Sequence, residues 1–115
     1  MNARKEFFIA TAPHGNPTLI RLEAVRLIDS FEVTADGATF RMAVHIPALA
    51  EENAIELRLS EWRSGLFCGV FCGGEMEYTR AVGEAAFNRL VLKKGAKAVR
   101  ERIEQEHAKG RVFNP

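Results

Sequence analysis

The chain has 115 residues, of which 47% are hydrophobic and 27% are charged, and its formal net charge is +1 at pH 7. This composition is typical of one globular domain and argues against intrinsic disorder. No apolar run reaches the ~18 residues of a transmembrane helix, and the first apolar stretch is too short for a secretory leader because it ends at Pro13. We therefore expect a soluble, cytoplasmic protein, with no membrane partner and a single domain over residues 1–115.

The charge is distributed unevenly along the chain. Residues 30–79 carry three basic and eight acidic side chains, whereas residues 80–115 carry nine basic and four acidic ones. An acidic middle and a basic end bear on the choice of partner more than on the fold.

Residues 5–73 are predicted to be rich in strands. Lys5–Ala12 is a short apolar segment that stops at a dense turn signal, Pro-His-Gly-Asn-Pro, over residues 13–17. In Thr18–Ile28 apolar and polar residues alternate, which favours a strand, although Asn16-Pro17 also resembles the start of a helix. We favour the strand and keep the helix as the alternative.

Asp36-Gly37 is a favoured two-residue turn for an antiparallel hairpin. With these two residues as the loop, apolar side chains face one another and a pair of opposite charges does too, as cross-strand pairing prefers. The predicted pairs are Ala35 with Ala38, Thr34 with Thr39, Val33 with Phe40, Glu32 with Arg41, and Phe31 with Met42.

Two further strands follow the hairpin. Residues 47–53 are polar and predict a loop or one helical turn. Ile55, Leu57 and Leu59 alternate with polar residues, which indicates a half-buried strand. Leu66–Cys72 is apolar on both faces, which predicts a central strand.

The remainder, residues 76–109, is predicted to be helical. Two apolar stripes have helical spacing: Val82, Ala85, Ala86, Phe87, Leu90 and Val91, then Leu92, Ala96, Val99 and Ile103. Gly95 either divides two helices or lies within one long helix, and Gly110 is placed to end the helical region. Strands followed by helices predict an α+β fold, with an antiparallel sheet and one or two C-terminal helices packed on one face.

Cys68 and Cys72 are the only cysteines. Two cysteines cannot form a disulfide scaffold, and one pair supplies half of the four ligands of a structural zinc site. We expect core packing for both, and we predict no metal and no cofactor. A cysteine nucleophile paired with His45 is the catalytic alternative, but no catalytic motif is present.

Glycines recur at residues 65, 69 and 73, within the predicted strand and at its ends. On a strand they share a face with Phe67 and Phe71 and leave room for a packed helix or for a ligand. We expect a helix to pack over the glycine face. A small-ligand site at residues 65–74 is the third functional hypothesis.

Arg89, Lys93, Lys97 and Arg100 lie at helical spacing and form one basic stripe if the helix runs through Gly95. A solvated helix face is the ordinary interpretation, and a contact with an acidic protein or with nucleic acid is the functional one. Trp62 lies between Glu61 and Arg63, where core packing competes with a role as an interface anchor.

No stretch carries a motif specific to an enzyme. The leading hypothesis is a non-enzymatic protein-protein interaction module, such as an inhibitor, adaptor or assembly subunit, whose partner could be a second copy in a homodimer. Its candidate contacts are Arg89, Lys93, Lys97, Arg100 and Trp62. Nucleic-acid binding through the basic C-terminal helix is the alternative.

Overall fold

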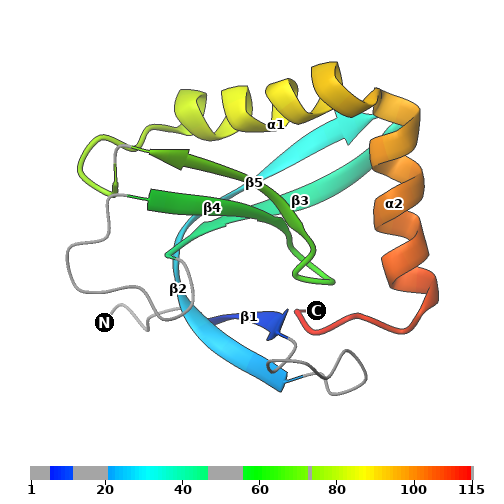
Figure 1. The fold of residues 1–115 in the computed structure, drawn as a ribbon, viewed down its shortest axis with the longest axis horizontal. Coiled ribbons are helices and arrows are strands. Elements are labelled where there is room, and N and C mark those ends of the chain that lie inside the picture. Colours follow the sequence, from blue (N-terminus) through cyan, green and yellow to red (C-terminus); the bar gives the residue numbers. More distant parts are fainter. Residues whose placement is uncertain (1–5, 12–20, 47–55, 73, 115) are drawn as a thin grey trace.

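The fold comes from a computed structural model that describes residues 6–11, 21–46, 56–72 and 74–114. Five strands precede two helices: β1 (Glu6–Thr11), β2 (Arg21–Ala35), β3 (Ala38–His45), β4 (Glu56–Glu61), β5 (Phe67–Cys72), α1 (Arg80–Lys94) and α2 (Ala96–Ala108) (Figure 1). Each strand pairs antiparallel with the next, in the order β1-β2-β3-β4-β5. The α+β prediction is confirmed.

The hairpin of β2 and β3 has the predicted register, from Ala35 opposite Ala38 to Phe31 opposite Met42. Asp36 and Gly37 both have positive φ, at 50° and 78°. This is the backbone geometry of the tight turn that matches the twist of a hairpin. The segment from Arg21 to Ile28 belongs to β2, so the strand interpretation of that region is also confirmed. The predicted loop at residues 47–53 lies outside the described residues.

β2 changes partners along its length and bends where it does so. Its first part pairs with β1 and its second part with β3, and the register with β3 shifts between Leu27 and Asp29. The bend carries β1 and the start of β2 away from the plane of β3, β4 and β5 (Figure 1). The sheet is therefore strongly curved and has a concave face.

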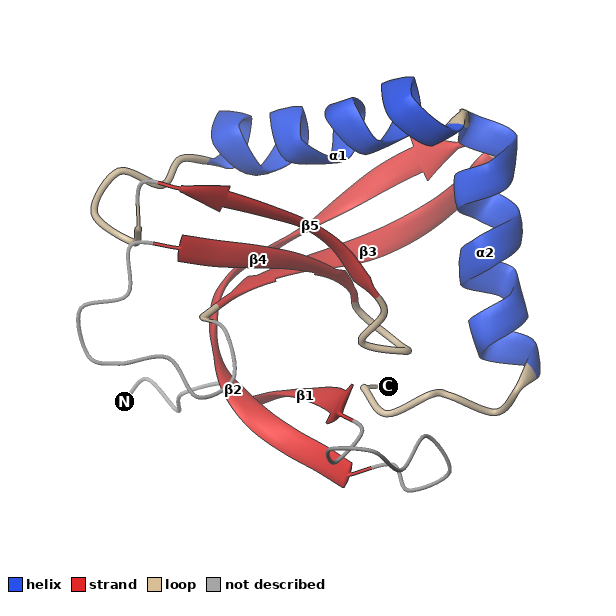
Figure 2. Ribbon diagram, in the orientation of Figure 1, coloured by secondary structure: helices blue, strands red, loops and turns tan. Residues whose placement is uncertain are grey.

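The helices lie over the opposite, convex face. α1 begins after Thr79, whose side-chain oxygen accepts a hydrogen bond from the Val82 N–H at 3.3 Å. Gly95 has a φ of 89°, which ends α1, and α2 then turns away along the side of the sheet toward β1 (Figure 2). Gly95 therefore divides two helices, and the single long helix is excluded. No helix among the described residues is long and apolar enough to span a membrane.

Two clusters of apolar side chains stabilise the two faces of the sheet. The larger cluster fills the space between the sheet and the helices and includes Phe31, Met42, Leu57, Leu59, Phe87 and Ile103. The smaller cluster lies on the concave face, where Phe7, Val25, Ala43 and Trp62 pack together. Because both faces are covered, β3 and β4 bury side chains on both sides.

The prediction of a central strand at Leu66–Cys72 is wrong, because β5 is at the edge of the described sheet. Apolar residues occur on both faces of β5 because of a register shift, and not because the strand is central. The register with β4 shifts between Leu59 and Ser60, so Cys68 has no partner in the ladder. As a result Phe71 packs in the larger cluster, whereas Phe67 lies beside Arg58 and is not on the face of Phe71 as predicted.

The segment after α2 crosses from the helix to β1. The Arg63 carbonyl oxygen accepts hydrogen bonds from the N–H groups of Phe113 and Asn114, at 2.6 and 3.1 Å. The Asn114 side chain accepts from the Phe8 N–H at 2.9 Å and donates to the Phe8 carbonyl oxygen at 2.8 Å. One amide thus satisfies the backbone of β1 on the side away from β2, much as a further strand would.

We expect replacement of Asn114 by alanine to destabilise the fold by about 1–3 kcal/mol, because it leaves two β1 backbone groups without their partners. Urea unfolding measures this free energy. The control is Asn88→Ala, a substitution of an exposed asparagine on α1, which should change it by less than about 0.5 kcal/mol. Equal effects of the two substitutions would contradict the bracing role of Asn114.

Candidate functional site

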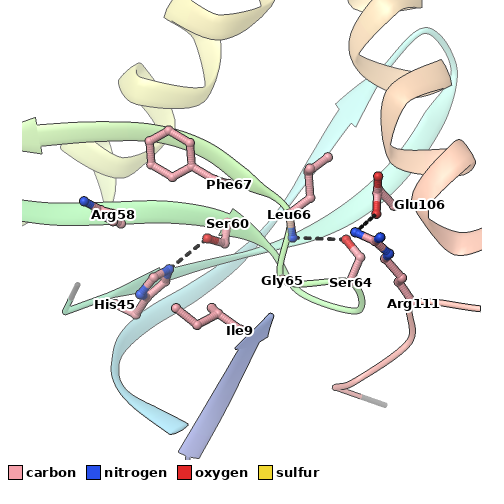
Figure 3. A pocket seen from close by; sticks show the side chains of 10 residues that line it. All are labelled: Ile9, His45, Arg58, Ser60, Ser64, Gly65, Leu66, Phe67, Glu106 and Arg111. Atoms are coloured by element: carbon pink, nitrogen blue, oxygen red, sulfur yellow. Dashed lines mark hydrogen bonds and ion pairs between the residues drawn. The ribbon is translucent and has the colours of Figure 1, made fainter. Parts of the chain in front are cut away.

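A cavity of about 210 Å³ opens on the concave face, between β1 on one side and β3, β4 and β5 on the other. The turn after β4, the end of α2 and the C-terminal segment complete its wall (Figure 3). The lining residues are Ile9, His45, Arg58, Ser60, Ser64, Gly65, Leu66, Phe67, Glu106 and Arg111. We call this cavity the Arg58 pocket.

His45 and Ser60 form the floor of the Arg58 pocket, and each is 1% exposed. The His45 Nδ1 lies 3.0 Å from the Ile46 carbonyl oxygen, which only accepts, so Nδ1 carries the proton. In the neutral ring Nε2 then accepts a hydrogen bond from the Ser60 hydroxyl at 2.8 Å. Phe7 packs against the same ring, with a centroid separation of 5.2 Å.

Burial lowers the pKa of His45, because the charged imidazolium would lose its hydration. The hydrogen bond to Ile46 opposes this shift, and the positive charge of Arg58 adds to it. Arg58 stands opposite His45 in the β3–β4 ladder, which explains why the two side chains interact. The floor of the pocket is therefore uncharged at neutral pH.

Arg58 supplies the positive charge of the pocket. Its guanidinium carbon lies 5.4 Å from the centroid of the Phe67 ring, in a cation–π contact. Its Nε is buried and has no hydrogen-bond partner among the described residues. The ion pairs within those residues also do not include Arg58. A buried N–H without a partner is costly, so this donor is a sign of a missing acceptor.

The opposite end of the pocket contains a buried carboxylate with three cationic partners. Glu106, with a side chain 3% exposed, pairs with Arg102, with Arg111 at 3.2 Å and with Lys109 at 3.5 Å. Burial alone would raise the pKa of Glu106, but the three cations together lower it. Arg111 therefore reaches the pocket as a partner of Glu106, on the side away from Arg58 (Figure 3).

The turn between β4 and β5 is fixed by a second buried carboxylate. Glu61, which is 1% exposed, accepts hydrogen bonds from the Arg63 N–H at 2.8 Å and from the Ser64 hydroxyl at 2.6 Å. The His107 Nε2 also lies 2.7 Å from the same carboxylate. These contacts hold Ser64 and Gly65 in place at the edge of the Arg58 pocket.

A second cavity, of about 430 Å³, lies between β5 and the two helices, on the other side of Phe67. Its lining is mostly aliphatic: Leu66, Leu90, Val99 and Ile103, with Cys68 among them. Arg102 borders it but is already paired with Glu106. This cavity offers fewer polar groups to orient a ligand than the Arg58 pocket does.

Cys68 packs beside the larger apolar cluster, as expected for a core cysteine. Burial raises the pKa of its thiol to about 12, so the reactive thiolate is scarce at neutral pH. Within the described part of the chain, no three His, Cys, Asp or Glu side chains lie together as a metal site would require.

The predicted basic stripe is divided between two helices by Gly95. Arg89 and Lys93 are exposed on α1 and have no ion pair within the described residues. On α2, Lys97 pairs with Glu101 at 4.0 Å.

Arg100 has a structural role in addition to any binding role. It pairs with Glu104 at 3.0 Å and donates a hydrogen bond to the Asp36 carbonyl oxygen at 2.6 Å. It therefore ties α2 to the turn of the β2–β3 hairpin. Its contact with a partner stays a prediction, as it does for the three lysine and arginine residues before it.

Trp62 lies in the smaller apolar cluster and is 9% exposed. Its ring packs against Phe7, at a centroid separation of 5.3 Å, and the Arg41 guanidinium stacks 3.7 Å from its centroid. These contacts give it a place in the core. Its role as an interface anchor stays a prediction, with little of the ring left for a partner.

Sequence reasoning missed Arg58, His45 and Ser60 as one site. The alternation in β4 assigned Arg58 and Ser60 to a polar face, which is solvated in a flat, half-buried strand. The available signal was His45 directly after the apolar run Met42, Ala43 and Val44. A polar residue there needs a partner, and Ser60 on the neighbouring strand supplies it.

The lowered pKa of His45 makes the fold sensitive to acid. Below about pH 6.5 the unfolded chain binds a proton that the folded chain does not, so stability falls as the pH falls through this range, by up to about 1.4 kcal/mol per pH unit. NMR of the imidazole nitrogens should show His45 titrating below 6.5 with the proton on Nδ1. Urea midpoints between pH 7.5 and 5.5 should depend less on pH in H45Q. A His45 that titrates at or above 6.5 would contradict the neutral, buried ring.

No protein-family model, curated protein or solved structure matches this chain. Its function is therefore considered from the chemistry of the Arg58 pocket and of the exposed helix surface.

Proposed function

We propose that the protein is a non-catalytic binding module that holds a small anionic molecule in the Arg58 pocket. This corresponds to the third hypothesis from the sequence, because Gly65, Leu66 and Phe67 belong to its wall. One observation carries the proposal. The Nε of the cation Arg58 is buried, and no described residue accepts a hydrogen bond from it.

The surroundings of Arg58 favour an anion from outside. The Phe67 ring holds the guanidinium from one side, and the neutral His45 does not compete for a negative charge. A carboxylate or another oxyanion would accept from the guanidinium N–H groups in a bidentate pair. Because Nε is buried, the Arg58 side chain must shift as the anion enters for Nε to join this pair. The anion would then supply the missing acceptor and compensate the charge of Arg58.

The His45–Ser60 pair supports binding more than catalysis. A serine hydroxyl that donates to a histidine Nε2 resembles an activated nucleophile. Both side chains are 1% exposed, however, so a substrate carbonyl carbon would have almost no access to the Ser60 oxygen. The raised pKa of Cys68 argues against the other nucleophile considered. We therefore assign the pair to the framework of the pocket.

The test is a titration of the ¹⁵N-labelled chain with acetate and with inorganic phosphate, at constant pH and ionic strength. We expect the backbone amides of Gly65, Leu66 and Phe67 to shift. Arg58→Gln should weaken the response about tenfold or more, because it removes a charge-assisted pair. Arg58→Lys should be intermediate, since it keeps the charge without the planar fork.

Arg89→Gln is the matched control, because it neutralises an exposed arginine far from the pocket and should leave the titration unchanged. Two outcomes would contradict the proposal. One is an unchanged response in Arg58→Gln with an intact spectrum. The other is a set of shifts confined to the outer face of α1.

A protein partner bound through α1 is a second candidate function, and one observation favours it. Leu92 is 86% exposed, and Arg89 and Lys93 on the same helix have no ion pair with any residue that the structure describes. An exposed leucine flanked by cations suits an acidic protein surface with an apolar centre. The acidic middle of this chain makes a second copy one such partner.

Sedimentation velocity tests this candidate over a range of protein concentrations. Self-association should weaken about tenfold or more in the double variant R89Q/K93Q, and less than about threefold in R63Q, which neutralises an exposed arginine in the β4–β5 turn. A chain that stays monomeric at all concentrations would contradict the homodimer. If nucleic acid is the partner instead, affinity for random duplex DNA should fall steeply with salt and should fall further in R89Q/K93Q.

A further inference from the structure

We infer that the ligand of the Arg58 pocket is a small monocarboxylate with a compact apolar body, of which an aromatic acid such as benzoate is the simplest example. This inference rests on the proposed function and specifies its ligand. It follows from the number of free charges in the pocket, from the chemistry of the walls and from the size of the cavity.

The charges of the pocket fit one negative charge. Among the described residues, the charged side chains that line it are Arg58, Arg111 and Glu106, whose charges sum to one positive charge, and Arg111 and Glu106 are paired with each other at 3.2 Å. Arg58 is the one of these that has no ion pair within the described residues. A doubly charged phosphate would have one of its charges uncompensated in a partly desolvated site, which is unfavourable.

The floor argues against a second anionic group. The Ser60 hydroxyl donates its hydrogen to His45, and the Ser64 hydroxyl donates its hydrogen to Glu61. The Ser64 oxygen also accepts from the Leu66 N–H at 3.2 Å, so neither hydroxyl has a further proton to donate to a ligand. A negatively charged group placed there would meet acceptors, so the carboxylate belongs at Arg58.

The walls favour an apolar body behind the carboxylate. Ile9 lines the pocket from β1 and Phe67 lines it at the start of β5, whereas the Leu66 side chain packs against the larger apolar cluster. Phe67 is 55% exposed, although it is a large aromatic side chain. A ring stacked beside Phe67 would cover this surface, and aromatic pairs gain from such contact.

The volume of the cavity indicates how large a ligand body it can enclose. A protein cavity of ~150 Å³ holds a benzene molecule, and the Arg58 pocket measures about 210 Å³. A six-membered ring with a carboxylate and one or two further carbons fits this space. A nucleotide or a long acyl chain would extend beyond it into solvent.

The experiment titrates the full ¹⁵N-labelled chain with four probes: benzoate, acetate, inorganic phosphate and benzyl alcohol. Benzoate combines the charge with the ring, acetate and phosphate carry charge without the ring, and benzyl alcohol carries the ring without the charge. We expect benzoate to bind at least about tenfold more tightly than each of the others, with shifts at Gly65, Leu66 and Phe67.

Two substitutions assign the contributions. R58Q should reduce benzoate affinity to that of benzyl alcohol, and F67A should reduce it toward that of acetate. The control L92A removes an exposed leucine on α1 and should leave benzoate binding unchanged. An F67A variant that binds benzoate like the native chain would overturn the assignment of the apolar wall.

The remaining outcomes separate the two proposals. If phosphate or acetate binds as tightly as benzoate and R58Q abolishes it, anion binding stands and the apolar carboxylate is wrong. If benzyl alcohol binds as tightly as benzoate, the charge of Arg58 contributes nothing and anion binding itself is wrong. If no probe shifts the pocket amides, or if the shifts lie at Leu90 and Val99 beside the second cavity, both proposals fail.

Discussion

The fold depends on the bend in β2, which lies where the strand changes from pairing with β1 to pairing with β3, at the register shift between Leu27 and Asp29 (Figure 1). Asp29 is held at this bend by the segment that leads into α1. It accepts hydrogen bonds from Arg80 at 2.7 and 2.8 Å and from the Tyr78 hydroxyl at 2.6 Å. The Arg80 guanidinium lowers the pKa of Asp29 despite its partial burial, so the carboxylate stays ionised. The bend of the sheet and the position of the first helix are thus fixed by the same side chain.

The curvature has a direct consequence for burial. It places Phe7 of β1 against His45 and Trp62, so the concave face of the sheet has an apolar cluster of its own. Polar residues on that face, such as His45 and Ser60, are enclosed and need partners within the protein. Most have them. Arg58 differs, because its neighbours supply an aromatic face and no acceptor among the described residues.

The parts of the fold that depend on neighbouring residues could be predicted from the sequence. The hairpin register follows from the turn at Asp36-Gly37 and from the residues that face each other across it. The helical segments follow from apolar spacing. By contrast, Gly95 is compatible with both a break and a continuous helix, and the choice depends on how α2 packs against the sheet. The edge position of β5 also could not be predicted from the sequence. A register shift at Cys68 gives this edge strand two apolar faces, which are otherwise typical of a central strand.

The candidate site was less accessible to sequence reasoning. Its members come from β1, β3, β4, β5 and the segment after α2, and no spacing along the chain relates them. The curvature of the sheet brings Ile9 and Arg111 into the same pocket as Arg58, and this curvature cannot be predicted from the local residue pattern of β2. Residues 65–67 of the glycine-rich segment, where the sequence suggested a small-ligand site, lie in the wall of the Arg58 pocket, and ligand binding there stays a prediction.

The bracing of β1 by Asn114 also bears on the order in which the molecule can fold. The two residues that this contact joins, Phe8 and Asn114, are 106 positions apart. Closing a loop of that length costs conformational entropy before any contact repays it, and such distant pairings slow folding. During synthesis, β1 cannot be braced until nearly all of this chain has left the ribosome. The hairpin and helices can form early from local contacts, whereas the concave face reaches its final shape last, when the beginning and the end of the described chain meet.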